Sequence, residues 1–147
     1  MRVSVQEAPF DLGQETSSFA TGHSDMGAIV TFTGVVRDLP GNPMQAMEIE
    51  HYPGMTEAAL REIAEQAIAR FSLGDALVIH RYGRLTPGEM IMMVATAARH
   101  RKDAFEAAEF LMDYLKSRAP FWKREITGTG ADWVAARDED EDALKRW

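Results

Sequence analysis

The chain has 147 residues and a formal net charge of −7, with 46% hydrophobic and 27% charged residues, which fits one globular domain over residues 1–147. The absence of cysteine excludes a disulfide framework, a thiolate nucleophile, a Cys-ligated zinc site and an iron–sulfur cluster. The acidic balance argues against non-specific nucleic-acid binding, which requires a basic face.

The first third of the chain predicts three strands and a short helix. Val3–Val5 is typical of a short strand, and Asp11–Ala20 of a short helix. Gly27–Val36 is rich in β-branched residues and predicts a strand that leads into the loop 38–43. Gln45–His51 alternates apolar and acidic side chains, which indicates a half-buried strand.

An amphipathic helix follows the turn Tyr52-Pro53-Gly54, with Thr56 as its expected N-cap. Its apolar residues recur at helical spacing, and Gly74 is expected to stop it; they are Leu60, Ile63, Ala64, Ala67, Ile68 and Phe71. Two further strands are predicted at Ala76–Tyr82 and Glu89–Ala98, joined by a turn through Pro87-Gly88.

A second long helix is predicted to begin at Asp103, paired with Glu106 in a capping-box arrangement, and to end before Pro120. We expect it to bury Phe105, Ala108, Met112 and Leu115. Phe121–Thr127 predicts a strand, Trp133-Val134 is a candidate start of another short element, and the acidic run 138–142 predicts a solvated surface or frayed tail.

The order of these elements predicts the fold class. Strands occur in adjacent pairs, so hairpins should dominate, and the class should be α+β: a mixed, largely antiparallel sheet with helices packed on it. No apolar stretch approaches membrane-spanning length, and the N-terminus becomes polar and acidic at once, so we expect a soluble cytoplasmic protein.

A basic segment runs from Arg99 to Arg124, where seven basic residues face four acidic ones. Its first part, His100-Arg101 with their neighbours, falls where a strand ends and a helix begins. Backbone N–H groups at a helix N-terminus, flanked by guanidinium and imidazole donors, suit an anion. The alternative is that these side chains only solvate a loop.

Two of the four lysines lie in the second part of this segment. Lys116 falls in the last helical turn and Lys123 on the strand beyond Pro120. The chain reverses direction between this helix and this strand, so both amines can reach one pocket. Two ammonium groups close together disfavour each other's charged form, which is one route to a nucleophilic or proton-shuttling lysine. The alternative is a lysine that extends past core aromatics to solvent.

The remaining polar residues give weaker signals. No two histidines stand at i, i+3 or i, i+4, so we expect no metal or other cofactor, apart from a ligand set assembled only in three dimensions. Arg37 lies where a strand leaves the core, and Arg137 follows Trp133-Val134; neither identifies a site alone. We interpret the His80-Arg81 pair and His51 as structural.

The same region carries a resemblance to a known family. The block from His100 to Glu125, with Met112-Asp113-Tyr114-Leu115-Lys116-Ser117-Arg118-Ala119-Pro120-Phe121-Trp122-Lys123-Arg124-Glu125 at its centre, resembles the large, catalytic subunit of molybdopterin synthase. Further pieces agree in order: Thr31-Phe32-Thr33-Gly34, Glu50-His51-Tyr52-Pro53-Gly54-Met55-Thr56, Val78-Ile79-His80-Arg81 and Lys145-Arg146-Trp147. The resemblance spans about residues 27–147 and implies an α/β-hammerhead type of α+β fold.

The resemblance also implies an activity and partners. Members of that family are sulfurtransferases of molybdenum cofactor biosynthesis, which convert cyclic pyranopterin monophosphate into molybdopterin. The sulfur arrives as a thiocarboxylate on the C-terminal Gly-Gly of a small ubiquitin-like subunit, which explains why this chain needs no thiol. A homodimer of large subunits with a small subunit at each end makes a heterotetramer.

Site residues follow from the resemblance position by position. Lys116 corresponds to the central catalytic lysine, and Lys123 to a catalytic or substrate-contacting lysine. The expected substrate-binding residues are Arg37, His100, Arg101, Lys116, Lys123, Arg124 and Arg137. The resemblance leaves open which of them serve a pocket completed by the other large subunit.

A competing interpretation is a non-catalytic module that captures a ubiquitin-like tail, because basic side chains and backbone donors can hold a C-terminal carboxylate without chemistry. The second basic cluster at His100-Arg101 favours an enzyme, since tail capture alone would not need it. A phosphate-ester enzyme of another class is disfavoured because the sequence shows neither a metal site nor a nucleophile motif.

Overall fold

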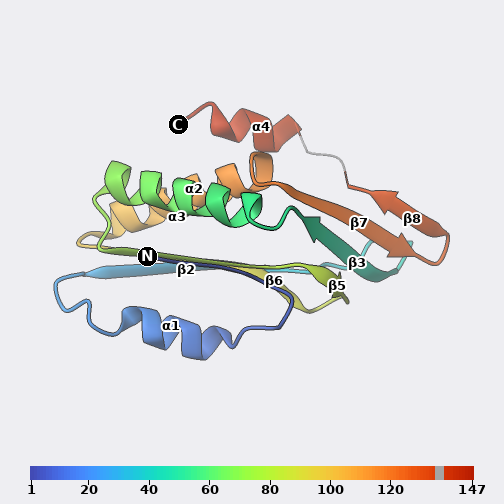
Figure 1. The fold of residues 1–147 in the computed structure, drawn as a ribbon, viewed down its shortest axis with the longest axis horizontal. Coiled ribbons are helices and arrows are strands. Elements are labelled where there is room, and N and C mark those ends of the chain that lie inside the picture. Colours follow the sequence, from blue (N-terminus) through green and yellow to red (C-terminus); the bar gives the residue numbers. More distant parts are fainter. Residues whose placement is uncertain (135–137) are drawn as a thin grey trace.

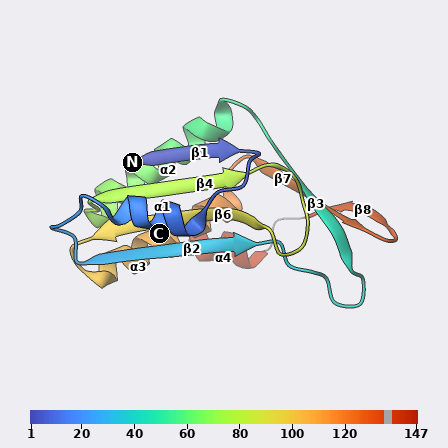
Figure 2. The same ribbon diagram turned by 90° about the horizontal axis from the view of Figure 1, so that it is seen from below.

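The strands form two four-stranded sheets in the structure, a computed structural model that describes residues 1–134 and 138–147 (Figures 1 and 2). The first sheet has the spatial order β1 (Arg2–Gln6), β4 (Asp75–Arg81), β6 (Met90–Ala98) and β2 (Ala28–Val35). The second has the order β5 (Gly83–Leu85), β3 (Met44–His51), β7 (Phe121–Thr127) and β8 (Gly130–Trp133). Only β1 and β4 pair in parallel, so the predicted α+β class with largely antiparallel strands is confirmed.

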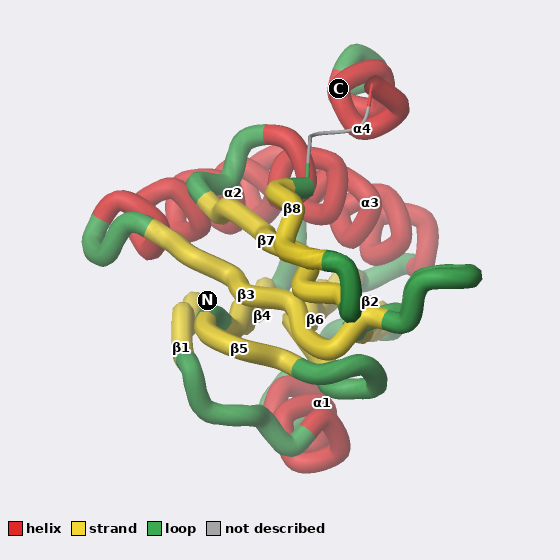
Figure 3. Tube along the Cα trace, turned by 90° about the vertical axis from the view of Figure 1, so that its right-hand side faces the viewer, coloured by secondary structure: helices red, strands yellow, loops and turns green. Residues whose placement is uncertain are grey.

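Helices cover both faces of the first sheet. The helices α2 (Met55–Phe71) and α3 (Arg101–Ser117) lie side by side on one face, and α1 (Leu12–Ala20) crosses the other (Figures 1 and 3). A fourth helix, α4 (Asp138–Leu144), packs on α3. Because β4 and β6 are enclosed on both faces, nearly every one of their residues is buried. In the described ranges no helix is long and apolar enough to cross a membrane.

The helix α2 follows the predicted apolar stripe, since Leu60, Ile63 and Phe71 are buried with their neighbours along that face. Its ends differ from the prediction. Gly54, with a φ of 83°, is the N-cap, whereas Thr56 lies inside the first turn, fully buried, with its hydroxyl 2.8 Å from the Tyr52 carbonyl oxygen.

The helix ends at Phe71 rather than at Gly74, because Ser72 adopts the left-handed conformation with a φ of 52°. Gly74 lies against Met26 instead: a Cβ there would stand 2.6 Å from the Met26 sulfur, so a larger residue would force that flexible side chain to move.

The helix α3 begins earlier and is rotated relative to the prediction. His100 is the N-cap and makes no side-chain capping bond, so Asp103 lies within the first turn. Phe105, expected in the core, is 58% exposed, whereas Ala108 and Leu115 are buried as predicted. Alanines at 104, 107 and 108 form the buried face, which lets the helix lie close to β6, where the Thr96 hydroxyl donates to the Ala104 carbonyl at 2.7 Å.

The strand pairing corrects the expectation of hairpins. β2 and β3, adjacent in the sequence, belong to different sheets, because the loop after Arg37 carries the chain from one sheet to the other. The short strand β5, predicted as part of a turn, leaves the first sheet and pairs with β3, so it ties the two sheets together. Trp133 ends the strand β8, rather than starting an element.

Candidate active site

Lys116 and Lys123 come together at the C-terminal end of α3. Lys116 occupies the last turn of that helix, and Lys123 lies on β7, just after the reversal at Pro120. Lys116 is exposed, whereas Lys123 is half-buried. Burial, reinforced by repulsion from the Lys116 ammonium, lowers the pKa of Lys123. Such a lysine reaches its neutral, proton-accepting form at lower pH than an ordinary surface lysine.

Buried His80, on β4, borders the same region. Its ring stacks on Phe121 with centroids 3.7 Å apart, and its Nδ1 donates to the Arg81 carbonyl oxygen at 2.7 Å. Burial lowers the pKa of His80 to about 3, and the positive charge of Lys123 adds to the effect. The His80 ring is therefore neutral near the lysine pair, where a positively charged imidazolium would repel both amines.

The sequence did not reveal this position of His80. The sequence indicated a structural role for both His80 and Arg81, and both are buried because β4 is covered on both faces. Arg81 is structural as predicted: its guanidinium donates to the Glu7 carbonyl at 3.0 Å and pairs with Glu89 at 3.2 Å. The signal available in the sequence was the preceding run Ala76-Leu77-Val78-Ile79, because four consecutive apolar residues do not fit a strand with one solvated face.

The acidic run 138–142 is part of this neighbourhood rather than a frayed tail. It forms α4, which is held against the end of α3 by the Arg118–Glu141 ion pair at 2.7 Å. From this helix the Asp140 carboxylate opposes the effect of Lys116 and raises the pKa of Lys123. The Asp140 carboxylate and the Lys116 ammonium group therefore shift the pKa of the Lys123 amine in opposite directions.

Arg124 turns away from Lys123, because successive residues of a strand point to opposite faces. Its guanidinium pairs with Glu48 and lies 5.6 Å above the centre of the Trp133 ring. Two buried polar atoms of this segment, Ser117 Oγ and Arg124 Nε, have no hydrogen-bond partner among the described residues. Ser117 is next to Lys116 in the sequence, whereas Arg124 lies on the face of β7 opposite to Lys123, so these two atoms do not belong to one site.

His100 and Arg101 lie far from the lysines, whereas Arg37 lies at the end of the first sheet towards which α3 runs back. His100 and Arg101 are exposed at the opposite end of α3, and the 15 positions from Arg101 to Lys116 correspond to about 22 Å along a helix. Arg37 is exposed just after the end of β2, at the end of the sheet where β6 begins. Arg137 lies outside the described residues. Among the described residues, one copy of the chain brings the two lysines together and keeps His100 and Arg101 at the other end of α3.

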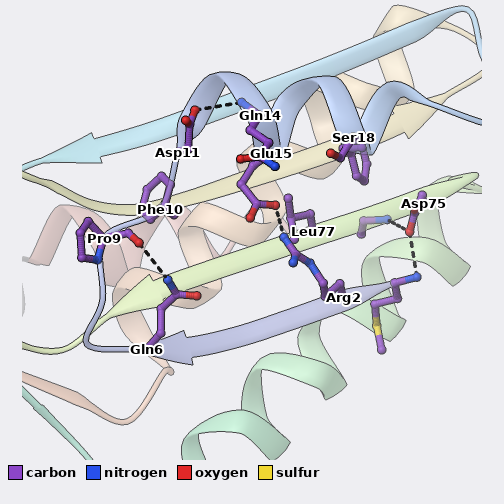
Figure 4. A pocket seen from close by; sticks show the side chains of 13 residues that line it. Arg2, Gln6, Pro9, Phe10, Asp11, Gln14, Glu15, Ser18, Asp75 and Leu77 are labelled. Atoms are coloured by element: carbon purple, nitrogen blue, oxygen red, sulfur yellow. Dashed lines mark hydrogen bonds and ion pairs between the residues drawn. The ribbon is translucent and has the colours of Figure 1, made fainter.

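A large cavity elsewhere contains none of the predicted residues. It has a volume of about 590 Å³ and lies between α1, β1 and the start of β4 (Figure 4). Its charged groups are paired with one another: Arg2 with Glu15, and the Met1 amine with Asp75 at 2.8 Å. Since these charges satisfy each other, the cavity shows no chemistry directed at a ligand.

Comparison with known proteins identifies the family of the chain. The profile of the family described as MoaE protein matches residues 5–118. The chain belongs to the MoaE protein family. The molybdopterin synthase catalytic subunit of Cereibacter sphaeroides is 68% identical to it over the whole length of both chains, and that of Salmonella typhimurium is 52% identical over 99% of this chain and 97% of the relative.

Solved structures of MoaE proteins share the fold. The molybdopterin biosynthesis MoaE protein from Burkholderia ambifaria superimposes with a TM-score of 0.85 at 50% identity, covering 99% of this chain and 96% of that one. The molybdopterin synthase from Staphylococcus aureus gives a TM-score of 0.83 at 29% identity, covering 90% and 96%. The family resemblance expected from the sequence is confirmed. The MoaE profile match includes Lys116, whereas Lys123 follows its end and is covered by the full-length relatives.

Proposed function

We propose that this chain is the catalytic subunit of a molybdopterin synthase, a sulfurtransferase that converts cyclic pyranopterin monophosphate into molybdopterin. The observation that carries the proposal is the meeting of Lys116 with half-buried Lys123, whose pKa is lowered, in a chain 68% identical over its full length to a molybdopterin synthase catalytic subunit. The reaction belongs to the cytoplasm in this proposal, as the sequence led us to expect.

The two lysines have complementary roles. Lys116, exposed at the helix end, meets the thiocarboxylate tail and stabilises the negative charge that develops on its carbonyl oxygen. Lys123, with its lowered pKa, is the better proton acceptor and donor as sulfur attacks the pterin side chain. Neutral His80 adds no charge that would compete with either amine.

The sulfur comes from a second protein, because this chain has no cysteine. The relatives are named catalytic subunits, which implies a further subunit. The proposed partner is a small ubiquitin-like sulfur carrier with a C-terminal Gly-Gly thiocarboxylate. An extended tail of this kind is narrow enough to approach the lysines, and its negative charge suits two amines.

A homodimer of large subunits would complete the site. The two ends of β2 are about 25 Å apart, with His100-Arg101 near its first residue and Arg37 beyond its last. If the β2 strands of two copies pair antiparallel about a two-fold axis, the start of each lies beside the end of the other. The partner's His100-Arg101 then approaches Arg37 and the C-terminal end of α3, where Lys116 lies.

The free edge of β2 favours this pairing. β2 is the last strand of its sheet, and Ile29, Phe32 and Val35 along it are more than a third exposed. Met90 and Phe105, on the neighbouring β6 and α3, are exposed as well. An eight-residue strand with an open edge and apolar side chains is an aggregation hazard unless another chain covers it.

The test mixes the chain with thiocarboxylated partner and cyclic pyranopterin monophosphate and measures the dithiolene product. We expect Lys116→Ala to abolish product formation while partner binding, measured by calorimetry, stays normal. Lys145→Ala, which removes an exposed lysine that follows α4 and pairs with Asp142, is the matched control. Activity retained in Lys116→Ala would overturn the assignment of that lysine, and no product from the unaltered chain would indicate a binding module instead.

A further inference from the structure

A cavity of about 290 Å³ lies on the second sheet and takes no part in the proposed chemistry; it is lined by Glu50, His51, Tyr52, Trp122 and Trp133. Strand register explains the grouping. Glu50 on β3 is directly opposite Trp122 on β7, and Trp133 on β8 is opposite Arg124, two positions further along. All three side chains therefore project from the face of the sheet opposite to Lys123.

The walls of this cavity are aromatic and open to solvent. Tyr52 and Trp122 pack edge to face, with ring centroids 4.7 Å apart. Tyr52, Trp122 and Trp133 are 55%, 42% and 56% exposed, which is unusual for side chains of this size in one place. Large aromatic residues gathered at the surface are typical of contact sites with other proteins.

A carboxylate without a counter-ion completes the cavity. Glu48, two residues earlier on the same face, is paired with both Arg124 and Arg84. Glu50 is exposed and forms no ion pair or side-chain hydrogen bond within the described ranges. The sheet also shows that its aromatic faces attract cations, because Arg124 already lies over Trp133.

We propose that this cavity, which we call the aromatic–carboxylate pocket, binds a lysine or arginine side chain of the small sulfur-carrier subunit. Aromatic faces and a carboxylate together attract a cation, through the ring quadrupoles and a charge-assisted hydrogen bond. The volume lies at the lower limit of the ~300–1,000 Å³ typical of small-molecule pockets, so it suits a single side chain better than a bicyclic substrate.

The position of the pocket favours the small subunit over a second copy of this chain. Trp122 directly precedes Lys123 on β7, so the pocket and the proposed sulfur-transfer site share one strand. A partner whose C-terminal tail reaches Lys116 must rest its folded body within a few residues of that strand. The homodimer edge proposed above belongs to the other sheet. The inference rests on the proposed function, because it assumes that this partner delivers the sulfur.

The experiment measures binding of the small subunit, in its carboxylate form, to the full-length chain by calorimetry. We expect Glu50→Gln and Trp133→Leu each to raise the Kd by about 5- to 30-fold, as expected for the loss of one desolvated cation contact. Product formation at saturating partner should keep its kcat, since both side chains project from the face of the sheet opposite to Lys123. Glu62→Gln, an exposed carboxylate on α2, is the matched control and should leave the Kd unchanged.

A double-mutant cycle identifies the occupant. Each lysine and arginine of the small subunit is replaced by glutamine in turn, and each replacement is combined with Glu50→Gln. One position should show a strong coupling energy with Glu50, whereas at the other positions the changes in binding free energy should be additive. Unchanged Kd values for Glu50→Gln and Trp133→Leu, or purely additive cycles, would overturn this inference and leave the function intact. Loss of dimerisation instead of partner binding would assign the pocket to a second copy, and no binding by the unaltered chain would overturn the proposed function too.

Discussion

Lowering the pH from 7 to 5 should destabilise the fold through His80, the only buried histidine among the four. Burial holds the pKa of His80 at about 3, against an ordinary value of 6.5. In the unfolded chain the ring gains a proton below pH 6.5, whereas in the folded chain it stays neutral down to about pH 3. The unfolded state therefore binds more protons between these values, so stability falls as the pH falls.

The size of the effect follows from the two pKa values. His80 contributes fully above pH 6.5, and its contribution decreases by about 2 kcal/mol between pH 7 and pH 5. For a chain of this length, such a loss lowers the Tm by about 4–8 °C. Below pH 5 the contribution continues to fall, by about 1.4 kcal/mol for each pH unit, until the folded ring itself becomes protonated.

Urea unfolding at pH 7 and pH 5 measures the free energy of unfolding, for the unaltered chain and for His80→Gln. The variant should lose about 2 kcal/mol less between the two pH values, because glutamine does not titrate and the contributions of all other groups cancel in the comparison. The same substitution at exposed His100 controls for the loss of an imidazole. Equal losses in both proteins, or an NMR titration of His80 near pH 6.5, would refute the reasoning.

Three further predictions concern the site and its support. Lys116→Gln should raise the pKa of Lys123, because it removes a repelling charge, and an unchanged value in the NMR titration of the ¹³C-methylated amine would contradict this. Thr56→Val should cost about 1–3 kcal/mol in urea unfolding, since the partly buried amide N–H of Tyr52 loses its acceptor, the fully buried Thr56 hydroxyl at 3.1 Å, while Thr56→Ser should cost less. Phe32→Lys should convert a dimer into monomers in sedimentation and reduce product formation, whereas Ala69→Lys on the outer face of α2 should do neither.

Local patterns predicted most of the secondary structure because they depend on neighbours along the chain. The apolar spacing of α2 and the alternation of β3 reflect one buried face each, and both elements formed where that spacing predicted. The buried face of the helix α3 could not be predicted in full from such local patterns. Phe105 was expected in the core, but Ala104 and Ala107 are buried in its place, because close packing on β6 favours small side chains.

Some features of the candidate site could likewise be predicted from the sequence, whereas others depend on the tertiary structure. The reversal at Pro120 is local, so the meeting of Lys116 and Lys123 could be predicted from seven residues of sequence. The distant neighbours of Lys123 could not be predicted, since Asp140, which raises its pKa, comes from α4, and His80, whose pKa Lys123 lowers, comes from β4. The separation of His100-Arg101 from the lysines also depends on the direction in which α3 runs back along β6.

The sequence by itself determined the family, the acidic and cysteine-free character of the chain, and the two lysines at the end of α3. Only the tertiary structure decided which charges surround them, because a pKa depends on burial and on groups brought close by the fold. It also decided that β2 and β3 belong to different sheets, which leaves one edge open for a second copy. The aromatic–carboxylate pocket likewise arises from the register of three strands, and no spacing along the chain predicts such a register.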